Sequence, residues 1–70
     1  MPFYEALKFI LTTTNTRVKR TSWDDCYLTK SYDTKYKRNR IIIVGERTNT
    51  SVLYTPSTDD LVSEDWVYYN

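Results

Sequence analysis

The stretch YTPSTDDLVSEDW, residues 54–66, decides how the end of the chain folds, because several local rules agree within it. Pro56 has no amide proton to give to a sheet, so it ends a preceding strand. Ser57 or Thr58 can then cap the free N–H groups of a helix start, and Asp60 occupies the capping-box position three residues after Ser57. Asp is shorter than the usual Glu, so the box is a weak variant. We expect a short helix to begin here.

The residues after this cap predict what the short helix packs against. Leu61 and Val62 supply its expected apolar side, while Asp59 and Asp60 lie where the positive end of a helix favours carboxylates. Residues 66–69 (WVYY) are aromatic and β-branched, which is typical of a strand. The stretch therefore predicts a capped connector that docks a terminal strand.

The N-terminal segment has the periodicity of an amphipathic helix of about ten residues that starts at Pro2. Apolar residues recur at the spacing of one helix face, at Phe3, Ala6, Leu7, Ile10 and Leu11. Residues 12–16 (TTTNT) lack this period, and their side chains compete for backbone hydrogen bonds, so the helix ends there. Asn15 can take a left-handed turn.

Four strands are expected in the middle of the chain, over residues 17–21, 26–32, 40–44 and 51–54. The run 40–44 (RIIIV) is the most apolar, so we expect it to be the central strand. It forms a hairpin with 51–54, and Gly45 predicts a bulge or a turn residue with positive φ. Residues 33–39 are polar and basic, which predicts a mobile loop.

Strands bracketed by helices, without a strand-helix-strand repeat, indicate an α+β fold formed by a single domain, residues 1–70. We expect the N-terminal helix to pack on a small, mostly antiparallel sheet, with the short second helix before the last strand. A chain of this length buries only about 60% of the surface that its unfolded form exposes. Its margin of stability is therefore small.

Composition limits how so short a chain gains stability and what chemistry it can perform. Cys26 is the single cysteine and histidine is absent, which excludes an intrachain disulfide and nearly excludes a zinc site. Seven Tyr, two Trp and two Phe supply the aromatic surface that subunit interfaces prefer, so we expect a homo-oligomer. The sequence has no nucleophile motif and no glycine-rich phosphate loop. We expect no enzyme activity, no cofactor and no metal.

Charge is unevenly distributed along a chain whose net charge is only +1. Lys and Arg concentrate in residues 17–47, whereas Asp59, Asp60, Glu64 and Asp65 lie close to the C-terminus. This pattern suits a small anionic ligand, or the acidic end of a neighbouring subunit, better than a long nucleic acid. No apolar run is long enough for a membrane span or a signal peptide, which predicts a cytoplasmic protein.

Two groups of residues are candidates for binding such an anion. Arg20 and Trp23 flank a strand end and could hold the phosphate and the base of a nucleotide. The alternative is that Trp23 is a core residue with Arg20 packed along it as a surface cation. Arg38 and Arg40, with the neighbouring lysines, could clamp a phosphate from a flexible loop, or could belong to an ordinary solvated loop.

Three segments resemble a known family. These are Phe3 with Ala6-Leu7, then Val18 with Arg20 and Trp23, and above all residues 56–67, PSTDDLVSEDWV. In this order they resemble the small phage proteins known as Thoeris anti-defence proteins of the second type. The chain departs from that pattern by lacking a glycine after the first helix, by Tyr54 in place of a tryptophan, and by a shorter middle.

The resemblance implies a non-enzymatic sponge. Similar proteins are phage-encoded and act in the cytoplasm of the infected bacterial host. They assemble as homo-oligomers, usually tetramers, and hold cyclic ADP-ribose-type immune signals between subunits without cleaving them, while some relatives take up other cyclic nucleotides. For such a sponge, the candidate ligand-binding residues are Arg20, Trp23, Tyr27, Arg38, Arg40, Asp60, Asp65 and Trp66.

Two other classes of function remain open from the sequence. The chain could inhibit a host enzyme by docking an aromatic patch on it, which predicts an exposed tyrosine cluster. It could instead be a small nucleic-acid-binding module that uses the basic residues between positions 17 and 40. That second class predicts an affinity for DNA or RNA that falls steeply with salt.

Overall fold

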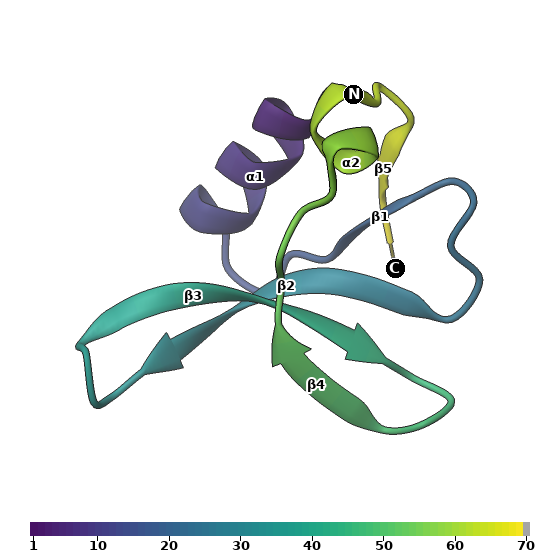
Figure 1. Cartoon of the computed structure of the whole chain (residues 1–70). Helices are drawn as coiled ribbons and strands as arrows, with labels where there is room; N and C mark the ends of the chain where they lie inside the picture. The colour runs from purple at the N-terminus through teal and green to yellow at the C-terminus, as the bar shows by residue number, and fades with distance from the viewer. Residues whose placement is uncertain (70) are drawn as a thin grey trace.

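The computed structural model describes residues 1–69 of the chain. Its elements confirm the predicted α+β order of a helix, four strands, a short helix and a last strand (Figure 1). They are α1 (Phe3–Thr12), β1 (Val18–Arg20), β2 (Cys26–Asp33), β3 (Arg38–Gly45), β4 (Thr50–Leu53), α2 (Thr58–Val62) and β5 (Trp66–Tyr68).

The five strands form one antiparallel sheet in the order β4-β3-β2-β1-β5. The last strand returns to pair with β1, so Val18 has Leu28 on one side and Tyr68 on the other. Both helices lie on the same side of the β2–β3 hairpin (Figure 1). The two helices therefore cover one face of the sheet and leave the other face uncovered.

The hydrophobic core lies between α1 and the covered face of the sheet. It has five buried residues: Ala6, Ile10, Val18, Leu28 and Trp66. Partly buried side chains pack around them, among them Phe3 from α1 and Trp23 from the β1–β2 turn. Ala6 and Ile10 belong to the helix face that the sequence predicted, so the periodicity identified the correct side of α1.

The prediction that residues 40–44 form the central strand is wrong. The strand over these residues, β3, lies second from the edge, and β2 is central. All of Ile41, Ile42, Ile43 and Val44 are only half-buried. Alternation along a strand sends Ile41 and Ile43 towards the core, whereas Ile42 and Val44 point to the face that no helix covers.

Residues 33–39 form a tight hairpin turn rather than the predicted mobile loop. The two strands extend into this segment, to Asp33 in β2 and from Arg38 in β3. The Asp33 Oδ1 atom accepts hydrogen bonds from the amides of Lys35, at 2.9 Å, and Tyr36, at 3.3 Å. Lys37 completes the turn with a φ of 53°. Local side-chain-to-backbone bonds thus order a segment whose composition suggested mobility.

Gly45 has neither the bulge nor the positive φ that the sequence suggested. It pairs in register with Cys26 on one side and Thr50 on the other, and the left-handed residue of the next turn is Asn49, with a φ of 52°. A Cβ atom at position 45 would lie 2.9 Å from the Thr48 Oγ1 atom, which is the local reason for a glycine. The left-handed conformation predicted for Asn15 is confirmed, with a φ of 58°.

The predicted capping box at the start of α2 is confirmed, but the expected apolar side of this helix is wrong. Leu61 and Val62 are 52% and 70% exposed, whereas the buried residue of α2 is Asp60. The helix turns its acidic side inward because the sheet presents Arg20 there. Its two apolar side chains are left on the outside.

Candidate functional site

Arg20 on β1 brings together three of the acidic residues near the C-terminus. Its Nη1 atom lies 3.0 Å from Asp59 Oδ2 and 3.2 Å from Asp60 Oδ1, and its Nε atom lies 3.1 Å from Asp65 Oδ1. The predicted alternation of β1 puts the Arg20 side chain on the covered face, beneath α2. These contacts raise the pKa of the guanidinium, first through the hydrogen bond with Asp65. Arg20 therefore already has three anionic partners.

Asp60 is the most tightly held of the three carboxylates. The Tyr54 hydroxyl donates to Asp60 Oδ2 at 2.7 Å, and the amide of Ser57 donates to the same oxygen at 3.4 Å. Burial by itself would raise the pKa of Asp60, but the hydrogen bonds from Tyr54, Ser57 and Arg20 together lower it. Burial and the bond to Asp60 raise the pKa of Tyr54. Asp60 thus remains an anion within a partly buried network.

Trp66 continues this network into the core. Its side chain is fully buried, and its indole Nε1 donates to the Asp60 carbonyl oxygen at 3.2 Å. Its ring lies 5.2 Å from the ring of Trp23 and 5.3 Å from that of Phe3, measured between centroids. Five of the eight predicted site residues therefore form one closed cluster that fastens α2 to β1 and β5. They are Arg20, Trp23, Asp60, Asp65 and Trp66.

The other three predicted residues lie on the face of the sheet that no helix covers, which we call the open face. Alternation places these side chains on it: Tyr27, Thr29 and Ser31 of β2, Arg38, Arg40, Ile42 and Val44 of β3, and Ser51 and Leu53 of β4. Residues of the opposite parity, such as Leu28 and Ile43, pack into the core. The predicted residues Tyr27, Arg38 and Arg40 are thus separated from Arg20 by the sheet itself.

One hollow on the open face surrounds Arg17 and Tyr27. It has a volume of about 350 Å³ and is lined by Asn15, Arg17, Tyr27 and Thr29. The Arg17 guanidinium carbon lies 5.1 Å from the centre of the Tyr27 ring and 5.5 Å from that of Tyr69. The two tyrosine rings are 5.3 Å apart. This geometry offers a cation and aromatic faces to the same ligand.

A second hollow surrounds Arg40, at the other end of the open face. It has a volume of about 310 Å³, and its lining includes Ser31, Asp33, Arg40, Ile42 and Leu53. The Arg40 Nε atom lies 3.0 Å from Asp33 Oδ2, an ion pair that does not have hydrogen-bonding geometry. The Arg40 guanidinium also lies 4.7 Å from the centre of the Tyr36 ring. A further hollow of about 520 Å³ adjoins it around Arg38 and Arg40.

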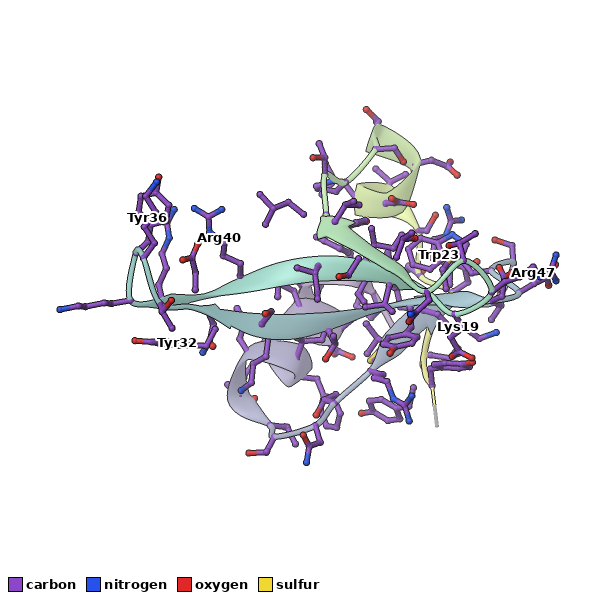
Figure 2. The ribbon with its side chains drawn as sticks, turned by 90° about the horizontal axis from the view of Figure 1, so that it is seen from below. Lys19, Trp23, Tyr32, Tyr36, Arg40 and Arg47 are labelled. Atoms are coloured by element: carbon purple, nitrogen blue, oxygen red, sulfur yellow. The ribbon has the colours of Figure 1, made fainter. Side chains whose placement is uncertain are left out.

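The two hollows meet at the centre of the open face. Thr29 lines the first and Ile42 lines the second, and these two residues are paired in register between β2 and β3. Figure 2 shows the two ends of the β2–β3 hairpin, with Tyr36 and Arg40 at one end and Lys19 at the other. The open face is therefore one continuous band with a cation-aromatic group at each end.

Sequence reasoning missed Arg17, Tyr36 and Tyr69 as candidates. Alternation did predict that Arg17 and Lys19 face away from Val18, but the partners of these cations depend on which strands pair. Tyr69 reaches Arg17 because β5 pairs with β1. The Tyr69 hydroxyl also donates a hydrogen bond to the Glu46 carboxylate, and this bond raises the pKa of Tyr69. Tyr36 reaches Arg40 because the 33–38 segment is a tight turn.

The chemistry that the open face offers is recognition of a planar, phosphate-bearing molecule. Guanidinium groups bind phosphate with charge-assisted hydrogen bonds, and tyrosine rings stack on bases.

Cys26 is half-buried, and burial raises the pKa of its thiol. Within residues 1–69, no group of three or more Cys, Asp or Glu side chains could hold a metal ion. The same residues contain no helix with the length and apolarity to cross a membrane.

This chain matches a known protein family over almost its whole length. The model of the Tad2-like family, described as the Thoeris anti-defense 2-like domain, covers residues 1–69. The chain belongs to the Tad2-like family. Membership supports a role for this Tad2-like protein in evasion of the Thoeris immune defence by phages. No curated protein matches the sequence.

Proposed function

We propose that this Tad2-like protein binds a cyclic ADP-ribose-type or cyclic-nucleotide immune signal and holds it without degrading it. The observation that carries the proposal is the pair of arginine-tyrosine hollows on the one face of the sheet that the helices leave uncovered. Sequestration in the cytoplasm of the infected bacterial host would deprive the defence effector of its activator. The protein acts as a binder and not as an enzyme.

The energetics suit capture by a small number of contacts. Binding in the micromolar to nanomolar range needs about 8–12 kcal/mol. Charge-assisted hydrogen bonds from Arg17 and Arg40 to phosphate, with bases on Tyr27 and Tyr36, supply contacts of the required kind. Arg20 contributes through the fold, because its guanidinium would have to release a carboxylate before it could take a phosphate.

The proposal includes a homo-oligomer, for which a tetramer fits the family resemblance. Both hollows are open to solvent in the single chain, whereas ligand sites usually enclose most of their ligand. A second subunit over each hollow would complete the enclosure.

Titration followed by recovery tests the proposal. Purified protein is titrated calorimetrically with cyclic ADP-ribose and with a panel of cyclic dinucleotides, and the loaded protein is then heated to release its ligand. We expect binding of at least one of them and release of an unchanged molecule, identified by mass spectrometry. A chemically altered product refutes sequestration, and a lack of binding across the panel refutes the choice of ligand class.

A second candidate function is inhibition of a host enzyme by direct docking. It is favoured by the exposure of Tyr32 and Tyr36, which are 59% and 54% exposed at the turn between β2 and β3. This function predicts that a tagged protein recovers a specific enzyme from the host lysate, and that a Tyr36→Ser variant does not. Sequestration predicts no such partner.

A further inference from the structure

The Asp33 carboxylate connects the cation and the aromatic ring of the hollow around Arg40. Its Oδ1 atom accepts the amides of Lys35 and Tyr36, at 2.9 and 3.3 Å, and its Oδ2 atom lies 3.0 Å from Arg40 Nε. The Arg40 guanidinium carbon in turn lies 4.7 Å from the centre of the Tyr36 ring. Asp33, Tyr36 and Arg40 therefore form a closed ring of contacts at one end of the β2–β3 hairpin (Figure 2).

The register of the hairpin places Asp33 and Arg40 on the same face of the sheet. Asp33 pairs with Arg38 and Ser31 pairs with Arg40, so Asp33 and Arg40 are diagonal neighbours on the open face. Their side chains are only 22% and 25% exposed. Opposite charges attract each other more strongly in such a partly buried position than in open solvent. The carboxylate can thus hold the guanidinium in place before a ligand arrives.

We propose that Asp33 is a positioning residue for the nucleotide, because it fixes the Arg40 guanidinium and the Tyr36 ring in the arrangement that binds a phosphate and a base. The inference rests on the proposed function, since it assigns a role within that site. Asp33 does not bind the phosphate itself, because two anions repel each other. It acts through Arg40 and Tyr36.

The contact with Asp33 also determines which edge of the Arg40 guanidinium a phosphate uses. The Nε atom is buried beside Asp33. The guanidinium has four further N–H donors, on its two Nη atoms. A phosphate in the hollow therefore binds the Nη edge, while the Nε edge stays against the carboxylate. Donors that are fixed in advance lower the ordering cost of binding.

The charge of Asp33 acts on an anion in the opposite direction from its positioning role. Three cations surround the Tyr36 ring, and their Nζ or guanidinium carbon atoms lie 5.5, 5.6 and 4.7 Å from its centre for Lys35, Arg38 and Arg40. A carboxylate among these cations weakens their attraction for an anion. If charge alone mattered, removing the carboxylate would strengthen nucleotide binding. The positioning role predicts weaker binding, so the sign of the change separates the two explanations.

The experiment compares Asp33→Asn, Asp33→Ala and Asp25→Asn by calorimetric titration with cyclic ADP-ribose and the panel of cyclic dinucleotides. The Asn side-chain oxygen can still accept the turn amides, but Asn has no charge to hold Arg40. Ala loses both contacts. Asp25→Asn is the matched control, because Asp25 also lies 3.1 Å from an arginine Nε atom, that of Arg47, in a pair whose side chains are 44% and 81% exposed.

We expect Asp33→Asn to weaken binding of the nucleotide that the wild type binds most tightly by about 3- to 10-fold, because one side chain must then be ordered on binding. Asp33→Ala frees two side chains and should weaken it by about 10- to 100-fold. Asp25→Asn should leave the affinity unchanged or raise it slightly. Circular dichroism and the urea midpoint of each variant verify that it is folded. Binding by Asp33→Asn that equals or exceeds that of the wild type overturns the proposal.

Nuclear magnetic resonance of the free protein tests the arrangement without a ligand. The Tyr36 ring should shift the resonances of the Arg40 side-chain protons upfield in the wild type and in Asp25→Asn. In Asp33→Asn this shift should be lost, while the backbone resonances of the turn keep their positions because the turn amides keep their acceptor. An upfield shift that persists in Asp33→Asn overturns the positioning role.

Failure of the proposed function gives a different result. If the wild type binds none of the nucleotides, the ligand assignment falls, and the spectra decide whether Asp33 fixes Arg40 and Tyr36. If the wild type and Asp33→Asn bind a nucleotide equally well, the ligand assignment stands and the positioning role falls. With both correct, Asp33→Asn loses affinity and the upfield shift together, and Asp25→Asn loses neither.

Discussion

At the scale of single residues, Asp60 and Arg20 explain why an acidic helix packs inward. The Asp60 carboxylate accepts the Ser57 amide at the start of α2, accepts the Tyr54 hydroxyl and pairs with Arg20, so one side chain joins α2, β1 and the segment after β4. Asp59, the preceding residue, contacts the same Arg20 from the surface, with 79% of its side chain exposed. Asp59 and Asp60 thus contribute differently to the stability of the fold, because only Asp60 lies inside the partly buried network.

Replacing Asp60 by Ala should lower the free energy of unfolding by about 2–3 kcal/mol, because the Ser57 amide and the Tyr54 hydroxyl lose their acceptor and Arg20 loses a partly buried partner. Asp59→Ala is the matched control and should change it by less than about 0.5 kcal/mol, since an exposed ion pair contributes little. Urea denaturation of both variants measures the difference. Equal losses would show that Asp60 has no special role.

Stability should depend on pH through the same network. Asp60 and Asp65 have lowered pKa values in the folded chain, so their contribution is complete above the unfolded carboxyl value of about 3.9. It is lost as the pH falls through the lower folded values. Tyr54 and Tyr69 have raised pKa values, so their contribution is complete below about pH 10 and is lost above it.

The melting temperature should therefore be nearly constant from about pH 5 to pH 8 and fall on both sides, because the raised pKa of the Cys26 thiol adds a loss that begins near its ordinary value of about 8.5. Scanning calorimetry across this range provides the measurement. Asp60→Asn should reduce the dependence on the acid side, and it should also weaken the alkaline limb, because the Asp60 carboxylate is part of what raises the pKa of Tyr54. A melting temperature that rises on acidification would contradict the role assigned to these carboxylates.

At the scale of elements, the residues of the β3–β4 hairpin pack closely over Gly45, which has no side chain. Gly45 pairs within the ladder, and the hydroxyls of Thr48 and Thr50 lie over it, 2.8 Å from each other. A methyl group at position 45 would be 2.9 Å from the Thr48 hydroxyl oxygen and 3.3 Å from that of Thr50. The turn thus takes up the space above the glycine.

Gly45→Ala should destabilise the protein by about 1 kcal/mol, because Thr48 must rotate and lose its hydrogen bond with Thr50. In a Thr48→Ala background the shortest contact is gone and the Thr50 hydroxyl, 3.3 Å away, can rotate, so the same substitution should stabilise by about 0.5–1 kcal/mol, since glycine is unfavourable inside a strand. The sign reversal in this double-mutant cycle is measured by urea denaturation. The same sign in both backgrounds would contradict the steric argument.

At the scale of the whole molecule, the sheet divides its residues by function. The covered face holds the core and the Arg20 network, and the open face holds the hollows that we propose bind the ligand. Positive charge gathers at both ends of the open face, although the net charge of the chain is only +1. Binding and folding can therefore be changed separately.

Arg40→Gln should weaken binding of the nucleotide that the wild type captures by about 10- to 100-fold, the loss expected for one charge-assisted contact. Arg47→Gln is the matched control. Arg47 also pairs with an aspartate through Nε, at 3.1 Å from Asp25, but its side chain is 81% exposed and lies in the β3–β4 turn. Calorimetric titration compares the two, and equal affinities would remove Arg40 from the site.

The sequence by itself determined the local structure of this protein. The period of Phe3 to Leu11 predicted α1, alternation and the β-branched run at 40–44 predicted strands, and Ser57 with Asp60 predicted the cap of α2. These features depend on neighbours a few residues apart, which the sequence shows directly. The two ends of the chain also carry the family pattern, and the family comparison confirms this resemblance.

Only the tertiary structure decided which of these pieces face one another. The pairing of β5 with β1 brings Tyr69 to Arg17, and the position of α2 brings Asp60 to Arg20, across separations of 52 and 40 residues. The strand order also made β2 central and left Ile42 and Val44 on the open face. Such contacts depend on the pairing of distant strands, and local periodicity carries no information about it.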